Sequence, residues 1–499
     1  MHSGAGFYAR RIIAAGWILL AQWLALGGAI HAGVSSPPID LTKLSLEELM
    51  DIEVTLVSRK KEKLFETAAA AFVLTQEDIR RSGVTSIAEA LRLVPGMVVA
   101  RIDANKWAVS ARGFNGRFAQ KLLVLIDGRS AYTPLFSGVF WEVQDVLLED
   151  VERIEVIRGP GATLWGSNAV NGVINIATRS AQDSQGGMAV VGGGTEERAV
   201  GQLRYGGRLG EDAYYRVYGK YFDRDAFVDA EGQDGADEWH MARGGLRLDW
   251  QADERNTLTT QGDIYGGGTG QRYRFAALEP PYQRVVDDET QRAGGNILVR
   301  WEHLNSAKSD LALQVYYDRT EWDDVLMQEI RDTYDVDFQH RFALSARQEV
   351  VWGWGYRHTR DATRGGFEFS LEPARRGVNF FSFFAQDNIA LTDRKLRLIA
   401  GGKFEYNDYT GFEYQPNARL LWTPQPEQTA WAAVSRAVRL PSRADDDVRL
   451  AFLTLPPGTI LDNTLPAMVV GMGDRQMKAE KLHAFEAGYR FRPRPDLLF

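Results

Sequence analysis

No spacing of chemically active residues in this sequence is typical of an enzyme. The seven histidines show neither the His-Glu-x-x-His spacing of a zinc site nor a cluster of ligands, and no Gly-x-Ser-x-Gly elbow is present. Residues 159–166 resemble a phosphate-binding loop but lack the Gly-Lys-Ser/Thr ending. Asp445, Asp446 and Asp447 could hold calcium, although a solvated acidic loop accounts for them more simply. We therefore predict that the chain is not an enzyme and needs neither a cofactor nor a bound metal.

The N-terminus has the organisation of an export signal. Arg10 and Arg11 precede an apolar run from Ile12 to about Gly28, and small residues lead from there to Ala32. A basic stretch, an apolar stretch and a small-residue exit form a secretory signal peptide, so we expect residues 1–32 to direct export. An uncleaved membrane anchor is the alternative, because the run is long for a signal. The net charge of −8 gives no sign of nucleic-acid binding.

Residues 59–180 show the mixed signals of a compact α+β domain, which follows an N-terminal segment at 33–58. Thr75 precedes an acid-rich helix start, and a further helix begins at Thr85 or Ser86. The apolar run 121–126 predicts a buried strand, which the Asp127-Gly128 pair turns. Helices and strands thus alternate over a length that can bury one core.

Residues 181–499 follow a different pattern, in which helix signals vanish and long segments alternate between apolar and polar residues. In the segment 213–221, one face carries Ala213, Tyr215, Val217, Gly219 and Tyr221. Strict alternation with period two predicts a strand that has one apolar face and one polar face. A soluble β-sandwich also alternates, but its strands are usually nearer five or six residues. We count about fourteen such segments and predict an antiparallel transmembrane β-barrel, with lipid outside and a wet interior.

Four blocks in the α+β region are similar to the plug of TonB-dependent outer-membrane receptors, nearest to the vitamin B12 and catecholate-siderophore types. The blocks are SARGF at 110–114, LVLIDGR at 123–129, VERIEVIRGP at 151–160 and GSNAVNGVINI at 166–176. Segments at 383–387, 411–416, 431–442 and 480–490 resemble strands of the same family's barrel. The resemblance implies an N-terminal α+β plug domain inside an antiparallel transmembrane β-barrel, located in the outer membrane of a Gram-negative bacterium.

The number of segments departs from the family's pattern. A complete member has about 22 strands, so about fourteen segments predict a barrel that is incomplete in this sequence. Pro493 and Pro495 also interrupt the last segment before Phe499, where a regular strand ladder cannot accommodate them. A smaller closed barrel and a non-functional truncated product are the alternatives.

The resemblance also implies roles for particular residues. The Ton box, which adds a strand to the partner TonB, would be Ile52, Glu53, Val54, Thr55 and Leu56. The same segment could instead be the first plug strand. A lock between plug and barrel would use Arg112, Glu152, Arg153, Glu155 and Arg158, for which a solvated strand face is the alternative. Ligand would contact the plug apex at Asn115, Arg117, Tyr132, Phe136 and Trp141.

The implied function is energy-coupled uptake of a scarce ligand, with an iron-siderophore as the first candidate and cobalamin as the second. The implied partners are TonB with its inner-membrane energising complex, the lipid of the outer membrane and the small ligand, and the implied state is a monomer. A passive or adhesive barrel without energy coupling is the alternative. An outer-membrane hydrolase would need a Ser-His pair, which we do not find in the sequence.

Overall fold

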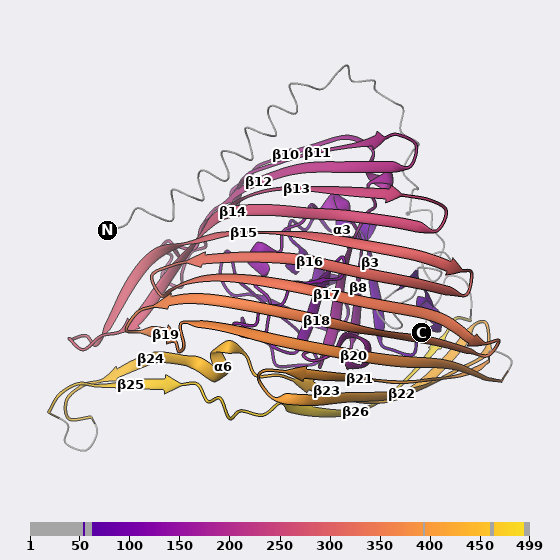
Figure 1. Cartoon of the computed structure of the whole chain (residues 1–499). Coiled ribbons are helices and arrows are strands. Elements are labelled where there is room, and N and C mark those ends of the chain that lie inside the picture. The colour runs from indigo at the N-terminus through magenta and orange to yellow at the C-terminus, as the bar shows by residue number, and fades with distance from the viewer. Residues whose placement is uncertain (1–52, 55–61, 393–394, 460–463, 494–499) are drawn as a thin grey trace.

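The computed structural model describes residues 53–54, 62–392, 395–459 and 464–493, and it divides them into two units (Figure 1). The first unit, residues 62–185, is called the plug here. The second is a 14-stranded sheet, called the wall, which curves around the plug (Figure 1). Within the described ranges, no helix combines the length and the apolar character needed to cross a membrane.

The plug is built around the five-stranded sheet β3-β8-β9-β6-β7, with β4 and β5 forming a separate pair. Strands β6 and β9 run parallel, whereas the other neighbours run antiparallel. Ile154, Ile174 and Ile176 are completely buried in its core. The strands are β3 (Ala71–Thr75), β4 (Met97–Arg101), β5 (Trp107–Ala111), β6 (Leu122–Ile126), β7 (Arg129–Ser130), β8 (Val151–Arg158) and β9 (Gly172–Thr178).

The two predicted helix starts in the plug are confirmed. The Thr75 hydroxyl accepts a hydrogen bond from the Asp78 amide (3.2 Å), and the Asp78 carboxylate accepts one from the Thr75 amide (2.9 Å), which completes a capping box. Gly83 ends this helix with φ of 71°. Ser86 caps the next helix through the Glu89 amide. The helices are α3 (Gln76–Ser82), α4 (Ile87–Ala90) and α5 (Ala162–Trp165), and the 3-10 turns are η2 (Leu64–Glu66), η3 (Leu91–Leu93), η4 (Trp141–Val143), η5 (Leu148–Asp150) and η6 (Gln182–Ser184).

The wall confirms the prediction of about fourteen long antiparallel strands. Each strand pairs with its neighbours in chain order, and the longest has 24 residues. The strands are β10 (Gly186–Gly192), β11 (Glu197–Leu209), β12 (Ala213–Arg224), β13 (Trp239–Gln251), β14 (Asn256–Ala276), β15 (Gln283–Ser306), β16 (Ser309–Asp323), β17 (Met327–Ser345), β18 (Gln348–Gly365), β20 (Arg375–Thr392), β21 (Leu396–Asn407), β22 (Gly411–Gln425), β23 (Gln428–Arg439) and β26 (Glu480–Phe491). In the described part of the chain, β10 and β26 do not pair with each other, so the wall does not close there.

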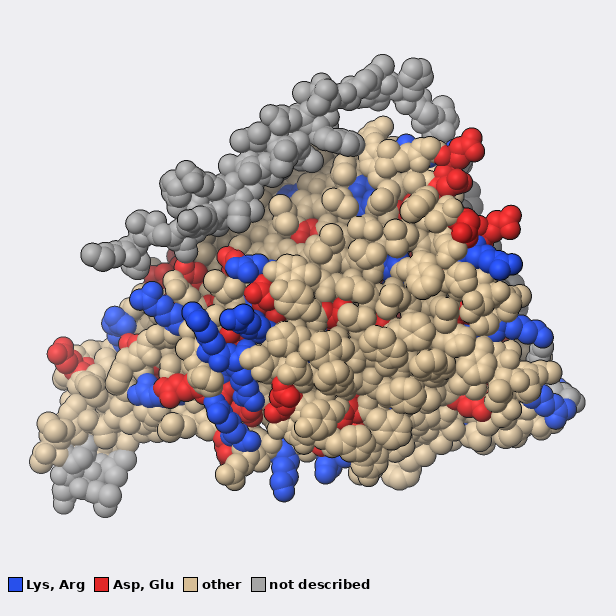
Figure 2. Space-filling model, viewed as in Figure 1, with Lys and Arg blue, Asp and Glu red and all other residues tan. Residues whose placement is uncertain are grey.

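The two faces of the wall reverse the usual polarity of a soluble protein. On β12, Arg216 and Lys220 point inward and are about 5% exposed, whereas Tyr221 on the other face is 43% exposed. The outer surface of the wall is a broad band with few charged side chains, and most of the charged side chains in view lie toward its two ends (Figure 2). An apolar exterior around a polar interior is the arrangement that a lipid environment requires of a spanning sheet.

The two ends of the wall differ in the length of their connections. At one end, the short-turn end, hairpins such as 210–212 and 307–308 join the strands. At the other, the long-loop end, the connections include 225–238 and 440–479. The long loops carry α6 (Arg443–Asp447) and the three-stranded sheet of β19 (Phe369–Leu371), β24 (Val448–Leu455) and β25 (Ala467–Met472). Nearer the N-terminus, the short strands β1 (Glu53–Val54) and β2 (Glu62–Lys63) form a separate antiparallel pair.

Candidate functional site between plug and wall

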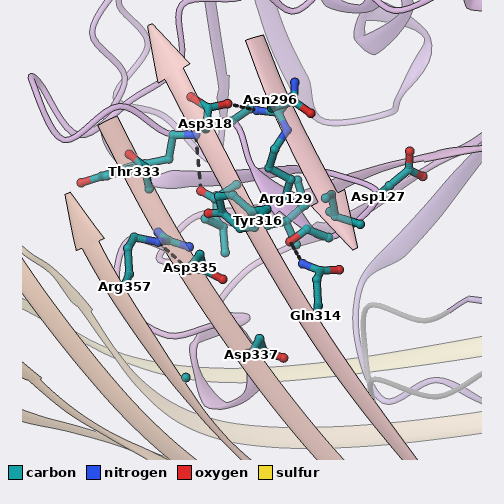
Figure 3. A pocket seen from close by; sticks show the side chains of 18 of the residues that line it. Asp127, Arg129, Asn296, Gln314, Tyr316, Asp318, Thr333, Asp335, Asp337 and Arg357 are labelled. Carbon is teal, nitrogen blue, oxygen red and sulfur yellow. Dashed lines mark hydrogen bonds and ion pairs between the residues drawn. The ribbon is translucent and has the colours of Figure 1, made fainter. Parts of the chain in front are cut away.

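A cavity of about 960 Å³ lies between the plug and the inner face of the wall. Its lining reaches from Thr178 and Arg247 near the short-turn end to Glu329 and Pro441 at the long-loop end. The cavity has a mixed lining of polar and apolar side chains, and acidic, basic and amide side chains from both units point into it (Figure 3). The side chains labelled in Figure 3 are Asp127, Arg129, Asn296, Gln314, Tyr316, Asp318, Thr333, Asp335, Asp337 and Arg357.

The turn between β6 and β7 is the main contact of the plug with this side of the wall. The Asp127 carboxylate accepts a hydrogen bond from the Gln261 amide (3.0 Å), and the Asp127 carbonyl accepts one from the Arg300 guanidinium (3.0 Å). The Gly128 carbonyl accepts one from the Gln314 amide (3.2 Å). Gly128 has φ of 84°, and a Cβ there would lie 2.5 Å from Arg300 Nη2. The turn therefore favours glycine for its backbone conformation, and a Cβ there would displace the ends of the Arg300 and Gln314 side chains.

Buried ion pairs join the plug to other strands of the wall. Asp145 accepts a hydrogen bond from Lys220 of β12 (2.6 Å), and both side chains are at most 8% exposed. The same arrangement joins Glu142 to Arg292 of β15 (2.9 Å). Asp150 of the plug likewise pairs with Arg204 of β11 (2.5 Å). In each case the acid comes from the plug and the cation comes from an inward-facing strand position, so opposite charges meet where water is scarce.

These acids were missed by the sequence reasoning. They lie in the segment 141–150, which has 3-10 turns and no strand pattern of its own. The available signal was indirect: acids recur within a largely apolar segment, and inward positions of the predicted strands carry basic residues at period two. That signal indicates charge complementarity but does not say which acid meets which base.

Of the five predicted lock residues, Arg112 forms an ion pair with the wall, to Glu486 of β26 (2.6 Å). Arg153 forms ion pairs with Glu152 (2.5 Å) and Glu155 (2.9 Å), both on its own strand β8. Glu152 and Arg153 also line the cavity. The fifth residue, Arg158, packs against Gly96 inside the plug. The lock role of these residues stays a prediction.

The predicted ligand residues are spread over different environments. Tyr132 lines the cavity, and its hydroxyl accepts a hydrogen bond from Asn168 (2.8 Å). Burial raises the pKa of the Tyr132 phenol to about 12. Phe136 and Trp141 are 6% and 8% exposed in the plug core. Asn115 is exposed, and Arg117 lies against the ring of its neighbour Phe118. The structure therefore brings Tyr132 to the cavity, and a ligand role for these residues stays a prediction.

The first residues of the loop 440–479, from Leu440 to Ala444, contact the plug near Tyr132. The amides of Arg443 and Ala444 donate hydrogen bonds to the carbonyls of Pro134 (2.9 Å) and Leu135 (2.8 Å). The amide of Leu440 donates to the Asn168 side chain (3.0 Å). This loop is therefore bonded directly to the plug backbone at the long-loop end of the cavity.

The acidic run 445–447 in this loop is neutralised by arginines. Arg443 is 1% exposed and forms ion pairs with Asp361 of β18 (3.1 Å) and with Asp447. Arg376 of β20 also pairs with Asp447 (2.5 Å). These pairs tie α6 to the wall, so α6 is fixed to plug and wall together.

The predicted Ton box is described in part. Glu53 and Val54 form β1 and pair antiparallel with β2, in the register Glu53 to Lys63 and Val54 to Glu62. Ile52, Thr55 and Leu56 lie outside the described residues. The TonB-binding role stays a prediction.

Comparison with known families gives two matches that together cover most of the chain. Residues 63–173 match the TonB-dependent Receptor Plug Domain. Residues 179–499 match the family described as TonB dependent receptor-like, beta-barrel.

Curated relatives include a ferric enterobactin receptor of Pseudomonas aeruginosa, which is 24% identical over 87% of this chain and 66% of the relative. An iron-regulated outer membrane virulence protein of Vibrio cholerae is 34% identical over 75% of this chain and 57% of the relative. The vitamin B12 transporter BtuB of Vibrio vulnificus is 32% identical over 29% of this chain and 23% of the transporter. The chain therefore spans between about a quarter and two thirds of the length of these relatives.

Solved structures with the same fold include the siderophore receptor PirA from Pseudomonas aeruginosa, with a TM-score of 0.64, 20% identity and coverage of 85% of this chain and 72% of that one. PirA from Acinetobacter baumannii gives a TM-score of 0.67 at 18% identity, covering 85% and 68%. With a matching plug, a matching barrel and this shared architecture, the chain belongs to the TonB-dependent receptors, a family of outer-membrane transport receptors rather than enzymes.

Proposed function

We propose that this chain acts in the TonB-driven uptake of an iron-siderophore across the outer membrane, with cobalamin as the second candidate ligand. The observation that carries the proposal is the cavity between plug and wall, which reaches from the long-loop end to the short-turn end and is lined by charged and amide side chains of both units. Water that enters such a cavity would replace the hydrogen bonds that a shift of the plug breaks, so the plug can move against its wall there.

The preference for an iron-siderophore rests on the extent of similarity. The match to the ferric enterobactin receptor covers 87% of this chain, whereas that to the vitamin B12 transporter covers 29%. The similarity to the vitamin B12 transporter is therefore evidence for a plug of the same kind rather than for the same ligand.

The two ends of the wall support a direction of transport. Outer-membrane barrels carry short turns on the periplasmic side and longer loops on the outside. We therefore place the loop 440–479 outside and β1 at the periplasmic side. Ligand arriving from outside would meet the loop that is bonded to Pro134 and Leu135 of the plug. TonB would pull from the opposite end.

Substitution of Val54 tests whether the predicted Ton box couples this chain to TonB. Strand addition to TonB uses backbone hydrogen bonds, so Val54→Pro should block it by removing an amide donor and fixing φ. Val54→Ala keeps the donor and serves as the control. We would measure uptake of iron-55 ferric enterobactin and of labelled cyanocobalamin in cells that lack their own receptors, together with surface binding of each ligand.

Energy-coupled transport predicts that Val54→Pro loses uptake but keeps surface binding, and that Val54→Ala keeps both. Uptake that continues in Val54→Pro cells, or in cells without TonB, would overturn the proposal in favour of a passive barrel. Cells that take up cyanocobalamin but not ferric enterobactin would show that cobalamin, the second candidate, is the transported ligand.

A further inference from the structure

Basic side chains gather on the outer face of the wall, over the ends of the strands near β19 (Figure 2). Strands β18 and β20 supply three of them, Arg360, Arg364 and Arg375, and all three are exposed. In the register of the sheet, Arg375 stands opposite Ala362, which lies between Arg360 and Arg364 on the neighbouring strand. Neighbouring strands are about 5 Å apart, so the three guanidinium groups share one small area, called the arginine patch here.

The three side chains of the arginine patch are not neutralised by ion pairs in the part of the wall that the structure describes, unlike nearby charged groups. Nearby Arg319 of β16 is held by Glu321 (2.8 Å) and Asp332 (3.1 Å). Among the residues that the structure describes, none of the three patch arginines has an ion-pair partner. Asp332, which stands opposite Arg360 on β17, is already paired with Arg319, so the three arginines keep their positive charge and leave an anion-binding area.

The patch is also open to an approaching group. Gly377 stands opposite Arg360, and Ala362 stands opposite Arg375, so no bulky side chain separates the arginines between β18 and β20. On the β17 side, Asp332 and Ile330 border the patch. Arginine presents a planar fork of donors that matches two phosphate oxygens at once. The patch therefore has the charge and the access needed to hold phosphate groups.

The position of the patch along the strands indicates where such phosphates come from. An outward-facing row of the wall runs across six strands, and most of its members are aromatic. In register order the row is Val315, Val336, Tyr356, Phe381, Tyr406 and Phe412. Aromatic rows of this kind mark the boundary between the hydrocarbon core and the headgroups. Arg360 is four residues beyond Tyr356 toward the long loops, which is about 13 Å along a strand.

We propose that Arg360, Arg364 and Arg375 form a docking surface for the phosphate-bearing headgroup of a membrane lipid at the long-loop end. The proposal rests on the membrane-spanning placement of the wall, not on the transported ligand. Bound lipid would connect β18 and β20 from outside, at the height where Asp361 of β18 and Arg376 of β20 hold α6 from inside.

The experiment uses the full chain purified in a phosphate-free detergent, with diphosphorylated lipid A as the probe. The triple variant Arg360→Gln, Arg364→Gln, Arg375→Gln removes the patch. A matched control, Arg255→Gln, Lys308→Gln, Arg347→Gln, removes three exposed cations from turns at the opposite end. A third variant changes the three patch arginines to lysine, which keeps the charge.

Lipid docking predicts that the patch variant binds diphosphorylated lipid A about a hundredfold more weakly than the parent, since each basic group near a charged membrane surface contributes about fivefold. The control should stay within about twofold of the parent, and the lysine variant should lie between parent and patch variant. Binding should fall as salt rises.

Three results would overturn the docking surface. The first is equal binding of the lipid by the parent and the patch variant. The second is equal binding of dephosphorylated lipid A, which would show that the acyl chains alone are bound. The third is full competition by inorganic phosphate at the lipid's own concentration, which would assign the patch to the free anion. None of these measurements depends on uptake, so the transport proposal can fail while this one stands.

Discussion

Arg129 on strand β7 of the plug donates a hydrogen bond to Asp318 on strand β16 of the wall, over 2.7 Å. The two side chains are 10% and 19% exposed, and both line the cavity between plug and wall (Figure 3). The pair is separated by 189 positions in the sequence, so it forms only when the plug is seated against the wall. It therefore reports on the seating of the plug.

Removing one partner of this pair should loosen the plug. Asp318→Asn leaves a shielded guanidinium without its anion, which costs about 3–5 kcal/mol in a buried pair and less where water reaches it. We expect a lower midpoint of thermal unfolding in detergent and faster proteolysis of the plug. The double variant Arg129→Gln, Asp318→Asn should recover part of the loss. Additive effects of the two changes would show that the side chains are not coupled.

Gly128 is a second probe of seating. Gly128→Ala forces a φ of 84° on alanine and pushes against Arg300, whose guanidinium donates to the Asp127 carbonyl. We expect a loss of about 1–3 kcal/mol of stability from the strained backbone, together with a weaker contact to the wall.

The matched control for Gly128 is Gly83→Ala. Gly83 also has positive φ (71°), but no atom lies within 4 Å of its Cβ position. The difference between the two variants in thermal unfolding therefore reports on the contacts of this turn with Arg300 and Gln314. Equal losses in both would mean that these contacts contribute nothing.

The regular elements of this fold could be predicted from local sequence, because local sequence determines them. Thr75 and Ser86 cap the helices that they were predicted to cap. The alternation in 213–221 places Arg216 and Lys220 on one face whatever the rest of the chain does. The prediction of about fourteen strands in the wall rested on the same two-residue alternation.

The contacts of the site could not be predicted in the same way. Whether Lys220 meets Asp145 depends on the register of every strand between them and on how the plug is turned inside the wall. Arg153 is a second example, because it was predicted to contact the wall but forms its ion pairs with carboxylates on its own strand β8. The alternation of apolar and polar residues predicts which face of a strand a side chain occupies, but it does not predict which residue that side chain contacts.

Tyr132 gives a prediction about pH. Burial disfavours the phenolate and raises the pKa of Tyr132 to about 12, above the usual value near 10. A group whose pKa is raised on folding stabilises the fold fully below its unfolded pKa. Its contribution is therefore intact below about pH 10 and is lost as the pH rises from about 10 to about 12.

The measurement for Tyr132 is a difference titration of tyrosinate absorbance between the parent and Tyr132→Phe. The phenol missing from the variant should titrate near pH 12. Tyr132→Phe also removes the hydrogen bond from Asn168, so a modest loss of stability, about 1 kcal/mol, is expected at neutral pH. A missing phenol that titrates near pH 10 would contradict the burial of this side chain.

Arg443 gives the last prediction, which concerns the loop 440–479. Its guanidinium bonds to Asp361 and Asp447, and its amide donates to the Pro134 carbonyl, so one residue joins wall, loop and plug. Arg443→Lys keeps the charge but loses the planar fork that reaches both carboxylates. We expect the amides of Arg443 and Ala444 to exchange hydrogen with solvent at least about tenfold faster, because the local opening free energy falls by about 1.4 kcal/mol or more. Arg475→Lys is the control, since Arg475 also pairs with Asp447 but is 57% exposed, where an ion pair contributes little. Faster exchange at 443–444 in the first variant alone would show that the buried guanidinium holds the loop on the plug, whereas equal exchange in both would mean that the backbone hydrogen bonds hold it without help.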